Sequence, residues 1–382
     1  MRVCIVYDCL YPYTIGGAER WYRNLAERLA SGGHEVTFLT RRQWPRDERP
    51  DVPDVDVVAV SPRMDLYTGG RRRILPPILF GLGVLAHLSR HRGRYDVVHT
   101  ASFPYFSVLA VAAARRRDAF RVIVDWFEVW TQRYWRDYLG SVGGALGWRV
   151  QRACIRVRQH AFCFSRLHER RLRELGFTGP LVRLEGLYRG DAAVGEPRPA
   201  RDVAVFAGRH IPEKRVPAIV PAIERARREL PDLRAEIYGD GPERARVVAE
   251  IARLGLDGVV SAPGFVSTHV LEEALASAAC LVLPSSREGY GLVVVESSAR
   301  GVPSVVVAGP DNAATELVEE GANGFLAASA DADELAAAIV RVVRAGPPLR
   351  QTTLEWFRRN AERLSIDRSL QAVAAEYASA AS

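Results

Sequence analysis

Short apolar runs alternate along the chain with longer segments in which apolar residues recur every three or four positions. Apolar runs of about four to eight residues between turn signals predict buried strands, and the longer periodic segments predict helices. Strands that alternate with helices form parallel sheets covered by helices on both faces. The sequence therefore predicts an α/β fold with doubly wound parallel sheets. The predicted strands are 2–7, 35–40, 55–60, 95–99, 120–125 and 161–164 in the first half of the chain, and 203–207, 235–238, 259–261, 280–283 and 304–307 in the second.

Two of the helical segments have a special composition. Residues 71–91 form a basic, apolar segment of helical length. Residues 353–381 form an amphipathic helix that we expect to cross back onto the first half of the chain. In the second half, the periodic segments between strands predict helices at 216–229, 243–254, 270–277 and 292–300.

The chain length and one lapse in periodicity predict two domains. A chain of 382 residues exceeds one ordinary hydrophobic core. Between residues 185 and 201 the periodicity gives way to glycine, proline and charged residues, as in a linker. We expect a Rossmann-like domain at 1–188, a second at 189–362, and a C-terminal helix at 363–382 that packs on the first domain. Two such domains leave a cleft between their strand ends, where ligands of this architecture bind.

The composition argues against several functional classes. A hydrophobic content of 48% and a charged content of 25% are typical of a soluble globular protein. No apolar stretch reaches the length of about 20 residues that crosses a bilayer, and no signal peptide precedes the first strand, so we expect a cytoplasmic protein. The arginines are scattered over many helices without a nucleic-acid-binding motif, so we expect no nucleic-acid partner. The five cysteines lack Cys-x-x-Cys spacing and are expected to be reduced core residues.

The stretch 284–296 carries the strongest chemical signal. A buried run leads into a glycine-containing loop and then into a predicted helix, and the N-terminus of a helix favours an anion. Gly289 and Gly291 allow a ligand to approach the backbone closely. On one continuous helix Glu288 and Glu296 would lie about 12 Å apart along the axis, too far to act on one atom. Two carboxylates that flank a phosphate-binding loop suit a nucleotide-sugar, which carries hydroxyls at both ends and negative charge in the middle.

A single lysine marks a second position of interest. Of 52 basic residues only Lys214 is a lysine, and it follows the predicted strand 203–207 together with Arg209. Because a compact ammonium and a planar guanidinium are not interchangeable, an exception to the arginine bias suggests that the side chain itself matters. Gly16 and Gly17 follow the first strand, where they serve either as a bare turn or as a close backbone approach to a phosphate or sugar.

Taken in order, these motifs resemble the retaining GT-B glycosyltransferases of the family 4 type, the glycosyl transferases of group 1. The resemblance covers essentially the whole chain and implies a transferase of the hexosyltransferase type with two Rossmann-like domains. The motifs that carry it are Gly16-Gly17-Ala18-Glu19, Gly208-Arg209-His210-Ile211-Pro212-Glu213-Lys214, Tyr238-Gly239-Asp240-Gly241-Pro242-Glu243, Glu288-x7-Glu296 and Glu316-x7-Gly324-Phe325-Leu326.

The resemblance also implies roles for individual residues. Arg209 and Lys214 match the basic pair that grips the donor diphosphate, where cations stabilise the charge of the leaving group. Glu288 matches the glutamate beside the transferred sugar, and Glu296 the one that binds the donor ribose. The remaining residues of the expected donor site are Gly16, Gly17, Gly208, Gly239, Gly289, Tyr290, Gly291 and Leu292, together with Gly264, Phe265 and Val266 along the nucleobase.

One position departs from the pattern of the family. Many relatives carry a histidine shortly after the strand that corresponds to 120–124, whereas Phe127 aligns with it here. Asp125 is therefore a candidate catalytic residue that takes over part of the polar role. On the acceptor side we expect His99, Trp126 and Glu128.

The implied reaction moves a sugar from a UDP- or GDP-sugar to an acceptor hydroxyl with retention of configuration. A double displacement needs two carboxyl groups about 5–5.5 Å apart, which the glutamate spacing does not supply, so a same-face attack fits better. The chain has no Asp-x-Asp motif of the metal-binding kind, and we expect neither a metal nor a cofactor. The acceptor is a glycan, a lipid-linked molecule or a small natural product.

Three other functions compete with this reaction. A phosphorylase of the same two-domain plan needs a lysine for pyridoxal phosphate, but the only lysine already has a role. A sugar-nucleotide epimerase would convert the donor without an acceptor, and a non-enzymatic protein would only bind the nucleotide-sugar.

Two segments of the first domain, 69–94 and 130–148, combine arginines with apolar or aromatic residues. Such segments either dock a protein on an anionic membrane beside a lipid-linked acceptor, or are ordinary helices with a solvated basic face.

Overall fold

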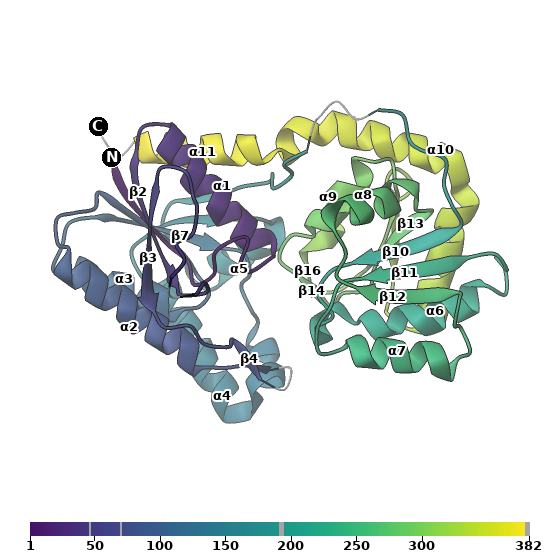
Figure 1. Cartoon of the computed structure of the whole chain (residues 1–382), viewed down its shortest axis with the longest axis horizontal. Coiled ribbons are helices and arrows are strands. Elements are labelled where there is room, and N and C mark those ends of the chain that lie inside the picture. Colours follow the sequence, from purple (N-terminus) through teal and green to yellow (C-terminus); the bar gives the residue numbers. More distant parts are fainter. Residues whose placement is uncertain (46, 69–70, 191–194, 379–382) are drawn as a thin grey trace. The chain divides into compact units, whose positions relative to one another are not determined.

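The structure is a computed structural model that describes residues 1–45, 47–68, 71–190 and 195–378. The chain divides into two compact units, which we call unit 1 (Met1–Leu187 and Asp367–Ser382) and unit 2 (Tyr188–Ile366) (Figure 1). Residues 69–70 of the basic segment, 191–194 of the expected linker and the last four residues of the expected C-terminal helix lie outside the described residues. Among the described residues, no helix is long and apolar enough to cross a membrane.

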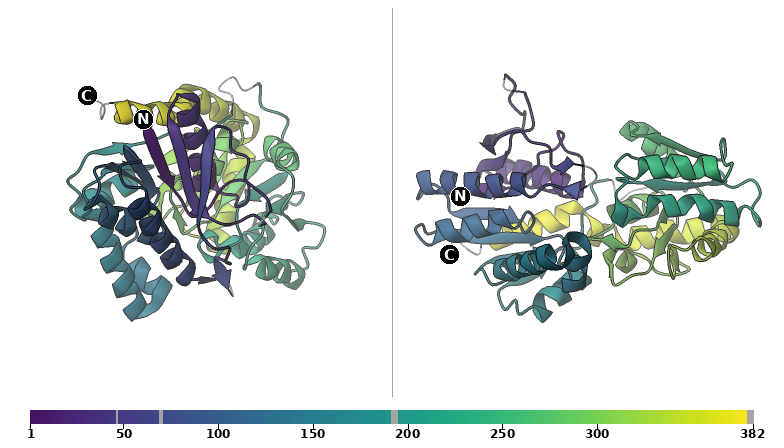
Figure 2. Two further views of the ribbon diagram at one scale, coloured as in Figure 1. Left: turned by 60° about the vertical axis from the view of Figure 1, so that its left-hand side comes forward. Right: turned by 90° about the horizontal axis from the view of Figure 1, so that it is seen from below.

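Unit 1 is built on a seven-stranded parallel sheet with helices on both of its faces (Figures 1 and 2). The strands follow the order β3-β2-β1-β6-β7-β8-β9. Their bounds are β1 Arg2–Val6, β2 Glu35–Arg41, β3 Val55–Ser61, β6 Val97–Ala101, β7 Arg121–Trp126, β8 His160–Cys163 and β9 Leu181–Arg183, and a small hairpin joins β4 (Tyr67–Thr68) to β5 (Arg71–Arg72). The helices are α1 Gly17–Ser31, α2 Leu75–Arg90, α3 Phe106–Arg115, α4 Gln132–Ile155, α5 Arg166–Glu174 and α11 Ile366–Ala378.

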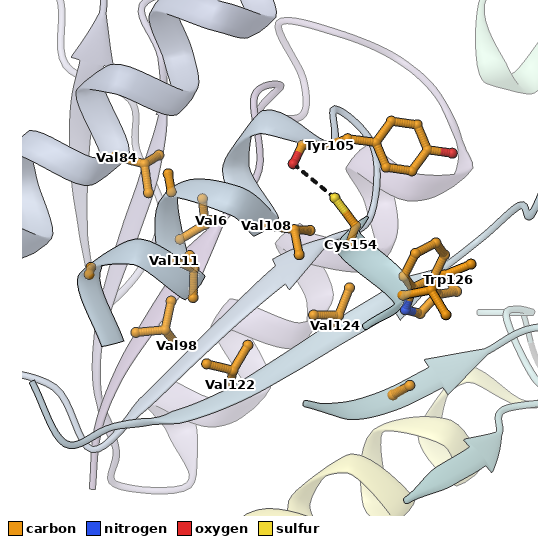
Figure 3. Close-up of a cluster of buried hydrophobic side chains, with 14 of the residues drawn as sticks. Val6, Val84, Val98, Tyr105, Val108, Val111, Val122, Val124, Trp126 and Cys154 are labelled. Carbon is orange, nitrogen blue, oxygen red and sulfur yellow. Dashed lines mark hydrogen bonds between the residues drawn. The ribbon is translucent and has the colours of Figure 1, made fainter. Parts of the chain in front are cut away.

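The core of unit 1 lies between the sheet and the helices that cover it, and Figure 3 shows part of it. Valines dominate because strands that are buried on both faces carry near-continuous β-branched residues. A fully buried valine or leucine side chain stabilises the fold by about 1.5–3 kcal/mol relative to its exposed state. The labelled residues include Val6, Val98, Val122 and Val124 from the strands, and Val84, Val108, Val111 and Cys154 from the helices.

Unit 2 repeats the plan with a six-stranded parallel sheet in the order β12-β11-β10-β13-β15-β17. The strands are β10 Val203–Ala207, β11 Arg234–Tyr238, β12 Val260–Gly264, β13 Cys280–Leu283, β15 Ser304–Val307 and β17 Gly324–Ala327. Short strands β14 (Arg287–Glu288) and β16 (Asp311–Asn312) pair with each other outside this sheet. The helices are α6 Ile219–Ala226, α7 Arg244–Arg253, α8 Thr268–Ser277, α9 Leu292–Ser298 and α10 Ala332–Leu364, with 3-10 turns at Pro212–Lys214, Val216–Ala218 and Ala313–Leu317.

In both sheets the strand order reverses next to the first strand of the unit. The reversal lies between β1 and β6 in unit 1 and between β10 and β13 in unit 2. Open α/β sheets bind their ligands at the carboxyl ends of the strands that flank such a reversal. The predicted doubly wound α/β class is therefore confirmed, and the loops after β1, β6, β10 and β13 are the expected ligand positions.

Two predicted helices differ from the structure. Residues 71–72 form strand β5, and helix α2 begins only at Leu75, because Pro76 and Pro77 fit the first turn of a helix but not its interior. The predicted helix 353–381 is divided: α10 begins earlier, changes direction at Gly346 (φ 56°) and ends before the extended Ser365, and α11 follows. The sequence prediction missed the first part of α10. All five cysteines are free and buried, as expected.

Candidate active site

Two loops of unit 2 meet where the strand order reverses. The loop after β10 runs through Arg209 to Lys214, and the loop after β13 runs through Ser285 to Gly291. The buried Asn312 braces the second loop, because its Nδ2 donates hydrogen bonds to the carbonyl oxygens of Ser285 (3.1 Å) and Val307 (2.8 Å). A buried amide with both partners in place holds the loop in one conformation.

An ion pair joins the two loops. The ammonium Nζ of Lys214 lies 2.5 Å from Oε1 of Glu288. The hydroxyl of Ser285 donates to the same Oε1 at 2.7 Å, and the backbone N–H of Ser286 donates to the carbonyl of Glu213 at 2.8 Å. Glu288 is 8% exposed, and the Lys214 side chain 20%. The only lysine of the chain is thus placed against the first glutamate of the Glu288-x7-Glu296 motif.

Within the described part of unit 2, Lys214 and Glu288 keep hydrogen-bond donors and an acceptor that no protein group uses. Both hydrogen bonds to Glu288 end on Oε1, and none of the described residues donates to Oε2. A carboxylate oxygen accepts about two hydrogen bonds and an ammonium donates three. The Lys214 ammonium makes one of its three to Glu288. The site can therefore accept a hydrogen bond from a ligand hydroxyl and donate to a ligand anion at the same place.

Steric constraints explain two glycines of the expected donor site. Gly291 has a φ of 100°, and a Cβ atom there would lie 2.5 Å from the Cβ of Ala314. Gly239 has a φ of 114°, and its Cβ would lie 1.9 Å from the carbonyl oxygen of Gly208. Only glycine fits both positions without a shift of the neighbouring backbone. The glycine at position 239 is thus explained by the close crossing of its loop with the backbone of Gly208.

The two glutamates of the motif do not share a helix. Glu288 belongs to the short strand β14, and α9 begins four residues later at Leu292. Glu296 lies within α9 and is half-buried. The sequence-based estimate of their separation assumed one continuous helix and therefore does not apply. Gly289 is half-buried between these elements and Tyr290 is buried.

The expected nucleobase segment follows β12. Gly264 ends that strand with a φ of 90°, Phe265 is exposed and Val266 is half-buried. The backbone N–H of Gly239 donates to the carbonyl of Gly264 at 2.9 Å, which brings this segment to the loop after β11.

Arg209 is exposed beside the fully buried His210. Burial lowers the pKa of His210, so this imidazole is neutral near pH 7.

In unit 1 the structure places Asp125 and His99 inside the fold. Asp125 is fully buried, and its Oδ2 accepts from the indole Nε1 of Trp21 at 2.7 Å. Its Oδ1 lies 2.8 Å from Nε2 of His99, whose Nδ1 lies 2.7 Å from the hydroxyl of Tyr377 on α11. Because a carboxylate accepts, His99 donates from Nε2, and in the neutral imidazole Nδ1 accepts from Tyr377. Burial raises the pKa of Tyr377 well above its usual value, which keeps this hydroxyl protonated.

The residues around Phe127 form an aromatic cluster. Phe127 stacks on Phe164 with ring centroids 4.4 Å apart and the planes nearly parallel. Trp126 is fully buried in the core that Figure 3 shows. Its Nε1 donates to Oε1 of Gln159 at 2.9 Å. Glu128 is half-buried and accepts from Nε1 of Trp130 at 2.6 Å. Phe127, which the resemblance aligns with a histidine of the family, therefore packs in this cluster.

At the start of α1, the two glycines have different surroundings. A Cβ on Gly16 would lie 2.3 Å from Oε2 of Glu19, whereas a Cβ on Gly17 would meet nothing within 4 Å. Gly17 thus borders open space.

Sequence reasoning missed Ser285 and Asn312, since a single serine or asparagine in a loop carries no signal of its partners. Among the described residues, no three of His, Cys, Asp and Glu are grouped closely enough to hold a metal ion.

Comparison with known proteins assigns the chain to a family. The family model described as "Glycosyl transferases group 1" matches residues 192–360, and the one described as "Glycosyl transferase 4-like domain" matches residues 16–186. A D-inositol 3-phosphate glycosyltransferase of Streptomyces avermitilis is 31% identical in an alignment of 366 positions that covers 86% of this chain and 75% of the relative. The chain belongs to the group 1 glycosyltransferases.

Other relatives of this glycosyltransferase match over a smaller share. An exopolysaccharide phosphotransferase of Streptomyces coelicolor is 36% identical in an alignment of 143 positions that covers 36% of this chain and only 14% of that protein.

Solved structures share the fold of both units. A sucrose-phosphate synthase from Thermosynechococcus elongatus covers 100% of both chains with a TM-score of 0.83 at 20% identity. The Anabaena protein Alr3699/HepE, solved in complex with UDP-glucose, matches 99% of this chain and 100% of its own with a TM-score of 0.76 at 16% identity. The predicted GT-B fold with two Rossmann-like sheets is confirmed.

Proposed function

We propose that this glycosyltransferase transfers a sugar, with retention of configuration, from a UDP- or GDP-sugar to a hydroxyl of a glycan, a lipid-linked molecule or a small molecule. The Lys214–Glu288 pair at the strand reversal of unit 2 is the observation that carries the proposal. Oε2 of Glu288 and the remaining N–H groups of Lys214 suit a ligand with a hydroxyl next to a diphosphate. The UDP-glucose held by a protein of similar fold supports a nucleotide-sugar donor.

The diphosphate is the part of the donor that we assign to Arg209 and Lys214. The Lys214 ammonium keeps two N–H groups for phosphate oxygens besides the one it gives to Glu288. Backbone N–H groups of the loop that ends at Gly291 and Leu292 add further donors. Charge-assisted hydrogen bonds of this kind are about twice as strong as neutral ones, so they stabilise the diphosphate as it leaves.

Glu288 is assigned to the transferred sugar, whose hydroxyl donates to Oε2. Glu296 accepts from the ribose hydroxyls, and the segment from Gly264 to Val266 lies along the base. Because Oε1 of Glu288 is fixed by Ser285 and Lys214, the free oxygen has one orientation. This preorganisation reduces the entropy that the enzyme must lose when it orients the sugar.

The reaction is a same-face displacement at the anomeric carbon. The bond between that carbon and the phosphate oxygen breaks, and a bond to the acceptor oxygen forms on the same face. The acceptor proton moves to the departing phosphate oxygen, whose charge Arg209 and Lys214 stabilise. We propose that neither a metal nor a cofactor takes part, since these two cations meet the electrostatic need.

In unit 1 we propose a positioning role for Asp125 and His99, because both lie inside the hydrogen-bonded network that holds Trp21 and Tyr377. The fully buried Trp126 would likewise act through its packing. Of the site residues expected in unit 1, Glu128 borders solvent and Gly17 borders open space. The cytoplasmic location stays a prediction.

Calorimetric titration with UDP, GDP and their glucose and mannose conjugates tests the donor assignment. We expect one nucleotide to bind, and Lys214→Ala to weaken its binding by at least tenfold, about 1.4 kcal/mol. Arg228→Ala, which removes an exposed cation just beyond the end of α6, is the matched control and should bind like the parent. The assignment would be refuted if neither nucleotide bound, or if the Lys214→Ala and Arg228→Ala variants bound the nucleotide with equal affinity. Turnover of a bound sugar nucleotide without any acceptor would instead indicate an epimerase.

A further inference from the structure

Helix α4 of unit 1 is a hairpin of two helical arms. Gly140 has a φ of 74° and divides the arm 132–139 from the arm 141–155. The arms approach each other at glycines: a Cβ on Gly144 would lie 2.6 Å from the Cα of Arg136, and one on Gly147 would lie 2.2 Å from the ring of Trp135. Trp135 is buried in this contact. The hairpin is therefore a rigid projection whose tip is residues 138–146.

The tip exposes apolar side chains. Val142 is 84% exposed and Leu146 is 63% exposed, and Leu139 and Tyr138 are also exposed. Val142 and Leu146 are four residues apart on one arm, so both side chains lie on the same face of that helix. Isolated exposed apolar residues are normal on a protein surface, but a group on one projection marks an interaction site.

Arginines flank this apolar tip. The hairpin contains four arginines and one acidic residue, Asp137, which gives it a net charge of +3. Arg133 is 91% exposed, and Arg136 and Arg149 are exposed as well. Arg149 follows Leu146 by three residues and therefore extends the same face. Apolar side chains bordered by arginines are typical of segments that lie in the interface of an anionic membrane.

Aromatic residues complete the pattern near the tip. Tyr138 stacks with Tyr134 at 6.0 Å between ring centroids and packs edge-on against Trp130 at 5.5 Å. Tyrosine and tryptophan are enriched at the level of lipid headgroups, because each combines an apolar ring with a polar group.

A second arginine cluster in unit 1 lacks the apolar component. A cavity of about 640 Å³ between the ends of α3 and α4 is lined by Arg115, Arg116, Arg156 and Arg158 with small or half-buried apolar residues. Both places carry basic charge, but among the described residues of α3 and α4 the exposed large apolar side chains are confined to the hairpin tip.

We propose that the α4 hairpin docks this enzyme on the surface of an anionic phospholipid bilayer, with Val142 and Leu146 inserted among the lipids and Arg136 and Arg149 at the headgroups. The docking does not depend on the donor chemistry. Its consequence, that the acceptor hydroxyl is presented by a membrane-bound molecule, rests on the proposed function.

Co-sedimentation with vesicles tests the proposal. The parent protein should bind vesicles of phosphatidylcholine with phosphatidylglycerol much more tightly than vesicles of phosphatidylcholine alone, and salt should weaken the binding. Val142→Ser with Leu146→Ser should weaken binding by at least tenfold without a change of charge. Val248→Ser with Val270→Ser, which changes two exposed apolar residues of unit 2, is the matched control and should bind like the parent.

The arginines are tested by a second matched pair. Arg136→Glu with Arg149→Glu should abolish binding to the anionic vesicles, whereas Arg116→Glu with Arg158→Glu changes the net charge by the same amount and should retain most of it. Equal losses in both pairs would show attraction by net charge alone and would overturn the docking site.

Two further outcomes would also overturn it. One is the absence of vesicle binding by the parent protein. The other is a dimer in analytical ultracentrifugation that the Val142→Ser and Leu146→Ser variant disrupts, which would assign the tip to a second copy of the chain. Nucleotide titration of the same variant should match the parent, so that failure of the docking and failure of the proposed donor site remain distinguishable.

Discussion

Two buried carboxylates, one in each unit, differ in how their oxygens are used. Asp125 is the penultimate residue of β7 in unit 1, and both of its oxygens have fixed partners, Trp21 and His99. Glu288 follows β13 in unit 2, and the two side chains that bind it, Lys214 and Ser285, share one oxygen. Both carboxylates are buried and both have polar partners, so burial does not separate them.

The difference lies in what each carboxylate can still accept. Asp125, which has a fixed donor on each oxygen inside the core, stabilises the fold, because its loss leaves buried donors without acceptors. Glu288 has no donor to Oε2 among the described residues, so that oxygen can accept a hydrogen bond from a ligand without the loss of an existing one. An oxygen without a protein donor therefore distinguishes Glu288 from Asp125, and the following variants test that distinction.

The largest effect is expected from Glu288→Gln. The amide keeps the shape and an acceptor for Ser285 but loses the charge that pairs with Lys214 and the strong acceptor for the sugar hydroxyl. We expect transfer activity to fall about 10²–10³-fold, with little change in stability, since loss of one preorganised polar group has this effect on catalysis. Steady-state kinetics and thermal unfolding of the same preparation measure both quantities.

Glu229→Gln serves as its matched control. Glu229 pairs with Arg344 at 2.7 Å, but its side chain is exposed, so this ion pair contributes about 0–1 kcal/mol. The control should keep the activity and stability of the parent. A Glu288→Gln enzyme with activity within threefold of the parent would remove the proposed role of this carboxylate.

Asp125→Ala should act on stability instead. It leaves Nε1 of Trp21 and Nε2 of His99 buried without an acceptor, at about 1–3 kcal/mol for each. We expect the free energy of unfolding of unit 1 to fall by about 2–5 kcal/mol in urea titration. A variant with parental stability and no activity would place Asp125 among the reacting groups and reverse the comparison.

The smallest effect is expected from Tyr377→Phe. It removes only the hydroxyl that donates to Nδ1 of His99, a bond between α11 and β6. A typical hydrogen bond contributes about 0.5–1.5 kcal/mol, so the melting temperature should fall by about 2–4 °C. Activity measured well below the transition should stay at the parental level. A large loss of activity without a shift in melting would contradict a purely structural network.

Much of the fold could be predicted from the sequence, because buried parallel strands produce short apolar runs. Lys214 could be identified from composition alone. Its contact with Glu288 could not, since it joins residues 74 positions apart through loops without periodicity. The two partners of Asp125 were equally hidden, because they come from helix α1 and from β6, which in turn contacts the C-terminal helix. The break between α10 and α11 was missed because amphipathic periodicity continues across Ser365.

A double-mutant cycle of Lys214→Ala and Glu288→Ala tests the central claim most directly. If the two side chains act as one unit on the donor, the double variant should lose little more kcat/KM than the worse single variant, with a coupling energy of about 1.5–3 kcal/mol. Losses that simply add, with a coupling energy below about 0.5 kcal/mol, would show that the pair has no joint role and would contradict the account.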